Sequence, residues 1–125
     1  MKVCILGYNL TSLALAKALA KKEIFVELFY KKQNIKIDTT RTIGISKSNI
    51  DYFNSEISNI KKMLWPIKKI KIFTENSNNK EILKFENQKD KLFSILQNKK
   101  IFNQLTIELK KNKFIKFKKN MKPNI

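Results

Sequence analysis

The chain has 125 residues, which is room for one domain, and its apolar fraction of 42% is typical of a globular protein rather than a disordered one. It contains one cysteine, Cys4, and no histidine. These counts exclude a disulfide framework, a cysteine-based zinc site and every histidine-dependent catalytic triad. The formal net charge of +17 would ordinarily indicate nucleic acid or an anionic membrane as the partner.

The source of the charge weakens that indication. Of the 27 cationic residues, 26 are lysine, and Arg41 is the one arginine. Lysine, isoleucine and asparagine together supply 58 of the 125 residues, a triple excess that an AT-rich coding sequence produces wherever the fold tolerates it. Arginine is the better side chain for bidentate phosphate and base contacts. We therefore attribute the charge to codon bias and expect no nucleic-acid partner.

The first thirty residues predict a strand, a helix and a second strand. Residues 2–6 are a short apolar run, typical of a strand buried on both faces of a parallel sheet. A turn begins at Gly7, and Thr11 or Ser12 can cap a helix of about twelve residues. Residues 24–30 are β-branched and aromatic and predict the next strand. Together they make one βαβ unit, so the fold class is α/β.

The middle of the chain predicts a loop, a helix and a hairpin. Residues 31–42 are polar, and Ser48 with Asp51 resembles a capping box for a helix that runs to about residue 64, where Trp65-Pro66 would stop it. Two alternating stretches, 67–75 and 81–86, flank an asparagine-rich turn and predict a β-hairpin.

The last third predicts a strand, a helix and a strand. Residues 92–96 are a short apolar run, Asn98 can cap a helix with leucines and isoleucine four residues apart, and residues 114–117 can form a final strand. No apolar stretch reaches the roughly 20 residues of a membrane-spanning helix. The apolar start could be a secretory signal, but polar residues interrupt it, and we expect a cytoplasmic protein.

The turn after the first strand carries the chemistry. Dinucleotide folds place G-x-G-x-x-G here, so that the backbone approaches a pyrophosphate lying on a helix N-terminus. This chain has Gly7, Asn9 and Ser12 at the three glycine positions, with Leu10 and Thr11 between the last two. Asparagine is the residue after glycine that best tolerates positive φ, and serine is small. The open alternative is an ordinary strand-to-helix turn.

A second check on this hypothesis fails. Dinucleotide folds usually place an acidic residue at the end of the second strand, where it binds the ribose hydroxyls. Tyr30 occupies that position, and Glu27 lies too early in the strand. A phenol can donate or accept a hydrogen bond, so Tyr30 remains a candidate ribose contact.

Beyond these patterns, the chain resembles a family. The Val3–Gly7 run, the alanine-rich helix, the 26–30 strand and above all the Arg41-Thr-Ile-Gly-Ile-Ser46 stretch are similar to the start of the ubiquinone-biosynthesis hydroxylases. These are FAD-dependent aromatic-ring monooxygenases of the p-hydroxybenzoate hydroxylase class. The Trp65 region and the segment from Asn98 also resemble that family, so the resemblance covers essentially the whole chain.

The resemblance implies a set of cofactor contacts. Gly7, Asn9 and Ser12 stand at the positions of the pyrophosphate-binding glycines. Arg41 stands where the family has a flavin-contacting arginine, a suitable role for a planar guanidinium. Lys99 stands where the family usually has a second cofactor-contacting arginine. Lysine keeps the positive charge but lacks the planar guanidinium that donates two parallel hydrogen bonds.

The resemblance further implies that residues 1–125 are the N-terminal portion of an FAD/NAD(P)-binding domain, an incomplete Rossmann-like unit without the substrate domain. Family members are roughly three times longer, and their later Asp-Gly and Gly-Asp motifs do not occur here. NAD(P)H would be the reductant and a polyprenyl-phenol the substrate, which suggests peripheral membrane contact. No catalytic acid or base and no metal ligand is expected in this part, and this portion alone is not expected to hydroxylate.

Two other readings stay open. The first is a small basic nucleic-acid-binding domain, in which the lysines and phenylalanines of residues 113–119 would stack on single-stranded bases. An edge strand with an exposed lysine face explains the same pattern. The second is a Rossmann-like structural module that binds no cofactor.

Overall fold

A computed structural model describes residues 1–32, 39–76, 78, 80–86 and 93–124, and it is mixed α/β, as expected. The first sheet is parallel and has the strand order β1-β2-β8. Its strands are Lys2–Leu6 (β1), Phe25–Tyr30 (β2) and Ile115–Lys119 (β8). The predicted strand–helix–strand unit at the start of the chain is confirmed, and β8 adds a third strand that pairs with β2.

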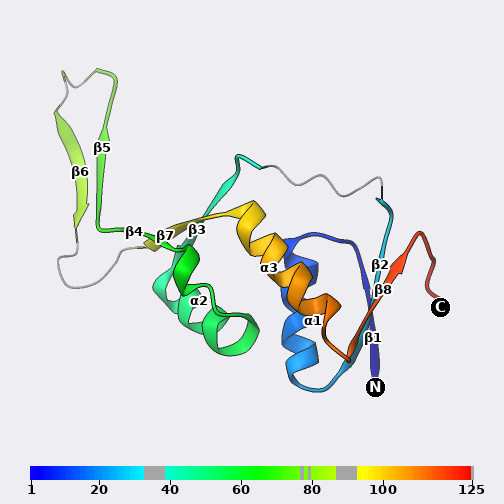
Figure 1. Cartoon of the computed structure of the whole chain (residues 1–125). Coiled ribbons are helices and arrows are strands. Elements are labelled where there is room, and N and C mark those ends of the chain that lie inside the picture. Colours follow the sequence, from blue (N-terminus) through cyan, green and yellow to red (C-terminus); the bar gives the residue numbers. More distant parts are fainter. Residues whose placement is uncertain (33–38, 77, 79, 87–92, 125) are drawn as a thin grey trace.

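Two helices cover one face of this sheet and lie side by side in Figure 1. They are α1 (Leu10–Lys21) and α3 (Asn98–Lys110). The small or apolar residues Ser12, Leu13, Ala16 and Ala20 form the buried stripe of α1, so the helix can pack closely. Leu28 of β2 and Leu105 of α3 are fully buried in the same core.

The second sheet is antiparallel and has the order β3-β7-β4. Its strands are Thr42–Ser46 (β3), Phe93–Gln97 (β7) and Trp65–Ile67 (β4). The sequence pattern does not predict β3. It does predict β7, although residue 92 of the predicted span lies outside the described residues.

The predicted hairpin is confirmed as β5 (Lys69–Phe73) paired with β6 (Glu81–Glu86), and it projects away from the rest of the molecule (Figure 1). The single strand predicted over 67–75 is instead two strands, because Trp65–Ile67 pairs with β7 before the hairpin begins.

The second predicted helix is shorter than expected. It consists of α2 (Lys47–Tyr52) and a π-helical turn, Phe53–Ile57, followed by a 3₁₀ turn at Lys61–Met63. The chain turns extended at Ser58, whose hydroxyl donates to Glu108 at 2.8 Å, while the Asn54 side chain accepts from the Ile60 amide. One hydrogen bond to a distant residue and one local side-chain hydrogen bond replace helical ones here, so the prediction of a helix to residue 64 is wrong.

The predicted N-caps are also wrong. Asn9 caps α1 instead of Thr11 or Ser12, and Ser46 caps α2 instead of Ser48. Asn98 is not a cap, because it lies inside the first turn of α3 and Gln97 precedes it. In each case the helix begins one to three residues earlier than the pattern indicates, directly where the preceding strand or turn ends.

Candidate functional site

Gly7 makes the turn between β1 and α1 possible. Its φ is +123°, a conformation that residues with a Cβ rarely adopt. Its amide donates to the Phe29 carbonyl at 2.8 Å and extends the β1–β2 pairing by one residue. A Cβ on Gly7 would lie 3.3 Å from the Ser12 Oγ, so the position also has little room for a side chain. The first glycine of the motif is therefore required by both conformation and space.

Asn9 plays a role different from the expected one. Its φ is −127°, so the expectation that it supplies a positive φ is wrong. Its side-chain oxygen instead accepts from the Ser12 amide at 2.9 Å as the N-cap of α1. The Leu13 amide bonds to the Asn9 carbonyl, which leaves Leu10 and Thr11 as the first-turn amides without an acceptor inside the helix.

Ser12 fills the space that Gly7 leaves open. It is 8% exposed, and its Oγ and the Asn9 Nδ2 are the atoms nearest to a hypothetical Gly7 Cβ. The neighbouring Tyr8 ring packs against Tyr30, Phe102 and Phe117. The serine thus performs the close-packing role of the third glycine at the cost of a slightly larger group.

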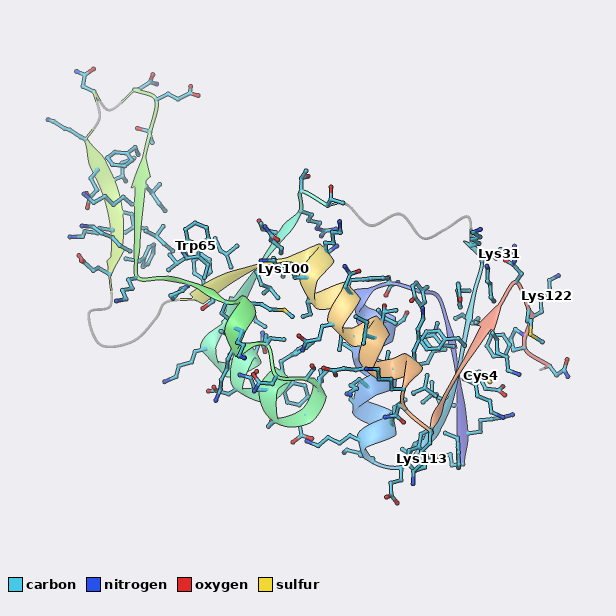
Figure 2. The ribbon with its side chains drawn as sticks, viewed as in Figure 1. Cys4, Lys31, Trp65, Lys100, Lys113 and Lys122 are labelled. Atoms are coloured by element: carbon cyan, nitrogen blue, oxygen red, sulfur yellow. The ribbon has the colours of Figure 1, made fainter. Side chains whose placement is uncertain are left out.

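A cavity of 280 Å³ opens where β1 and β2 end at their carboxyl termini. This is the edge of a parallel sheet at which nucleotides bind in open α/β folds. Gly7, Tyr30, Lys31 and Lys122 are among its lining residues. Figure 2 shows both lysines at this end of the sheet, and their ammonium groups suit an anionic ligand.

Tyr8 and Tyr30 form the inner wall of this cavity. Their rings stack with centroids 4.6 Å apart, and the Tyr8 ring meets Phe102 and Phe117 edge-on. The Tyr8 hydroxyl donates to the Thr106 Oγ1 at 3.2 Å, which ties the turn to α3. Burial, and secondarily the neighbouring Tyr8, raises the pKa of Tyr30 above 10.0. A tyrosine phenol is protonated at neutral pH even without this shift and can donate a hydrogen bond.

Arg41 and Lys99 come together although 58 residues separate them. The Asn98 amide donates to the Arg41 carbonyl at 3.0 Å, and Thr42 of β3 pairs with Gln97 of β7. Both cations are exposed, at the point where β3 begins and α3 begins. The structure therefore places the two predicted cofactor-contacting cations at one location; the contacts themselves stay predictions.

A second cavity, of 320 Å³, lies between the start of α1 and β3, the strand that follows Arg41. Leu10 lines it together with Ile43 and Gly44 of β3 and Ile101 of α3. Both cavities are mostly apolar, but two lysines line the first, whereas the residues that line the second are uncharged. The first cavity therefore offers cationic groups to an anionic ligand, and the second suits an apolar one.

Within the described ranges, no group of three His, Cys, Asp or Glu side chains lies close enough to hold a metal ion, and no helix is long and apolar enough to cross a membrane. The two phenylalanines of the basic C-terminal segment have different surroundings. Phe117 of β8 contacts Tyr8 in the core, whereas Phe114, just before β8, lies 5.0 Å from the Phe25 ring, which is 52% exposed.

The sequence analysis missed three features of the site. It did not find the Tyr8–Tyr30 stack, the lysines of the first cavity or the contribution of β3. A signal for Lys31 existed, since it directly follows the last residue of the second strand. Nothing in the sequence pattern places Lys122 there, because it reaches the cavity only through the pairing of β8 with β2.

Neither a protein-family model nor a curated protein sequence matches the chain. Solved structures do match. p-Nitrophenol 4-monooxygenase PnpA from Pseudomonas putida superposes with a TM-score of 0.73 at 14% identity, over 94% of this chain and 31% of that one. PqsL, a probable FAD-dependent monooxygenase from Pseudomonas aeruginosa, gives 0.72 at 10% identity, over 95% and 32%. The tetrameric 2-methyl-3-hydroxypyridine-5-carboxylic acid oxygenase gives 0.74 at 13% identity, over 95% and 31%.

At these identities the similarity establishes the fold. The chain has the fold of one part of these monooxygenases and spans about a third of their length.

Proposed function

We propose that this chain is the nucleotide-binding part of a flavin-dependent aromatic monooxygenase, an incomplete Rossmann-like unit spanning residues 1–125. The observation that carries the proposal is the Gly7 turn at the carboxyl edge of the parallel sheet: Gly7 lines the lysine-flanked cavity, and the helix that starts behind the turn leaves the Leu10 and Thr11 amides without an acceptor inside the helix. Helix N-terminal amides at this location favour a phosphate group. The fold shared with flavin monooxygenases supports FAD as the nucleotide.

The residues present fit an FAD molecule in two respects. The cavity with Tyr30, Lys31 and Lys122 would take the adenosine end, with the neutral Tyr30 phenol replacing the usual acid at the ribose. The cavity lined by Leu10 would take the flavin end of FAD, near Arg41 and Lys99. One feature opposes tight binding. The Ser12 amide already donates to the Asn9 side chain, so it cannot donate to a phosphate oxygen.

The finer assignment follows from the sequence resemblance. FAD, when bound and reduced by NAD(P)H, activates dioxygen to hydroxylate an electron-rich ring, and we propose a polyprenyl-phenol of ubiquinone biosynthesis as that ring. A membrane-borne substrate would bring the protein to a membrane surface, where exposed lysines favour anionic lipid. The contribution of residues 1–125 is to bind and orient the nucleotide.

The proposal is tested by a matched pair of glycine variants. Gly7→Ala should reduce ADP and FAD affinity at least about tenfold. Alanine rarely adopts a φ of +123°, and its Cβ would lie too close to the Ser12 Oγ, so the turn must change its conformation. Gly44→Ala is the control for ADP binding alone, since a Cβ there meets only the Phe93 ring at an ordinary 3.7 Å and ADP has no flavin group to enter the cavity that Gly44 lines. Isothermal titration calorimetry measures both, and circular dichroism checks folding. Equal ADP affinity in folded Gly7→Ala and Gly44→Ala would contradict the phosphate site.

A second variant should improve binding. Asn9→Gly releases the Ser12 amide to a phosphate oxygen, while glycine as an N-cap costs only a few tenths of a kcal/mol. Affinity for ADP should rise several-fold; Ser12→Gly should act in the same direction by widening the crook. If neither substitution changes ADP or FAD binding, the turn is not a phosphate site, and the structural-module alternative is favoured. Affinity that falls steeply with added salt for single-stranded DNA, but not for FAD, would favour the nucleic-acid alternative.

A further inference from the structure

The cavity at the carboxyl ends of β1 and β2 has the opposite charge to the usual ribose end of a nucleotide site. Dinucleotide folds usually place an acidic side chain where the second strand ends, and it binds the ribose hydroxyls. Tyr30 occupies that position, and Lys31 and Lys122 line the same cavity. Among the described residues that line it, none is acidic. A negatively charged group on the ribose would therefore meet two ammonium groups here and no carboxylate.

The carboxylate of β2 is engaged on the other side of the sheet. Glu27 lies three positions before Tyr30, so the two side chains point to opposite faces. The Glu27 carboxylate lies 3.3 Å from the Lys2 ammonium and 3.9 Å from that of Lys118. Lys122 also borders a cavity that Glu27 lines, but no ion pair joins the two in the part of the chain that the structure describes. Glu27 is thus paired with two lysines other than those of the first cavity.

Backbone pairing holds the segment of Lys122 beside that of Lys31. The Asn120 amide donates to the Tyr30 carbonyl at 2.7 Å, and the Asn120 Oδ1 accepts from the Lys32 amide at 3.3 Å. Asn120 has a φ of +55°, a conformation that asparagine tolerates, and the chain turns there directly after β8. Figure 2 shows both cavity lysines at this end of the sheet. Their proximity therefore follows from the pairing of β8 with β2.

We propose that this end of the nucleotide site binds adenine nucleotides that carry a phosphate ester on the ribose, with Lys31 and Lys122 as the cations that contact the ester. A phosphate monoester has a charge of about −1.5 to −2 at neutral pH, and each ammonium group pairs with it as a point charge. FAD has no phosphate on its ribose, so such a nucleotide would compete with FAD for the adenosine end. This inference rests on the proposed function, because the Gly7 turn must hold the 5′-phosphate of the same nucleotide.

Isothermal titration calorimetry on the full chain, at a constant salt concentration of about 0.15 M, tests the inference with three probes. They are AMP, adenosine 2′,5′-bisphosphate and adenosine 3′,5′-bisphosphate, and the bisphosphates differ from AMP only in the ribose phosphate. At least one bisphosphate should bind about tenfold more tightly than AMP and should displace ADP. The two isomers distinguish a phosphate on the 2′ oxygen from one on the 3′ oxygen.

Two double variants separate the cavity lysines from the general charge of the chain. In Lys31→Gln combined with Lys122→Gln, the affinity ratio of bisphosphate to AMP should fall to about one. Lys62→Gln combined with Lys116→Gln is the matched control, because it removes the same charge at exposed positions that do not line the cavity. The control should keep the ratio of the wild type. Circular dichroism checks that both proteins are folded.

The outcomes distinguish this inference from the proposed function. If ADP binds and neither bisphosphate binds more tightly than AMP, the inference is overturned while the nucleotide site stands. If the folded chain binds none of these nucleotides, both are overturned. A preference for bisphosphate that persists in the Lys31, Lys122 double variant would reflect the net charge of +17, and it too would overturn the inference.

Discussion

The parallel sheet and the β5–β6 hairpin are held together in opposite ways. The sheet buries Leu28 and Val26 almost completely under α1 and α3, whereas every residue of β6 is exposed. The hairpin depends on cross-strand pairs such as Ile70–Phe85 and on ion pairs, of which Lys71–Glu81 at 2.9 Å is one. An isolated two-stranded hairpin is only marginally stable in water. The Gly7 turn therefore belongs to the half of the molecule that has a buried core.

The largest expected effect tests this difference directly. Leu28→Ala removes a fully buried side chain of β2 and should lower the free energy of unfolding by about 2–5 kcal/mol. Leu83→Ala in the hairpin, where the side chain is 46% exposed, should cost less than about 1 kcal/mol. Urea denaturation followed by circular dichroism measures both. Similar losses in the two variants would show that the hairpin belongs to the same cooperative core.

An alkaline titration tests the burial of Tyr30, which lies in the parallel sheet. The folded state raises the pKa of Tyr30 above 10.0 through burial, so the folded protein holds the phenolic proton more tightly than the unfolded chain. The corresponding stability is complete below pH 10 and is lost as the pH rises through the folded-state pKa. Tyr30→Phe should therefore lose less stability than the wild type above pH 10, as measured by urea denaturation. An identical decline in both proteins would contradict the burial of the phenol.

The smallest effect belongs to the hairpin and lies at acid pH. The Lys84 ammonium, 2.6 Å from Glu86, lowers the pKa of that carboxyl below 4.5. The ion pair is present above pH 4.5 and is lost as the pH falls through the lowered pKa. Amide NMR shifts of β5 and β6 should then change, and Glu86→Gln should reduce this acid transition. An unchanged transition in Glu86→Gln would contradict the role of the Lys84–Glu86 ion pair.

The same contrast explains which elements the sequence predicts. The apolar run of β1, the alanine-rich α1 and the leucine spacing of α3 follow from burial in one core, and these elements are confirmed. β3 was not predictable because its five residues contain a central glycine and only partly buried isoleucines. The end of the second helix depends on a hydrogen bond between Ser58 and Glu108, fifty residues away, which no local pattern reveals.

For the candidate site, the local part was predictable and the remote part was not. Gly7 follows from motif spacing, and its φ of +123° confirms the need for glycine. Residue preferences alone could not predict the role of Asn9. Asparagine favours both positive φ and N-cap positions, and in this structure Asn9 is an N-cap. The cavity walls depend on tertiary pairing that brings Lys122 beside Lys31.

The pairing of β2 with β8 has a consequence for how the protein forms. Val26 and Ile115 are neighbours in the sheet although 89 positions separate them, and Tyr8 reaches across a similar span to Thr106. Such distant partners close large loops, which slows folding compared with chains built from nearby contacts. During synthesis β2 must wait for β8, which lies far along the chain, before its second edge is paired.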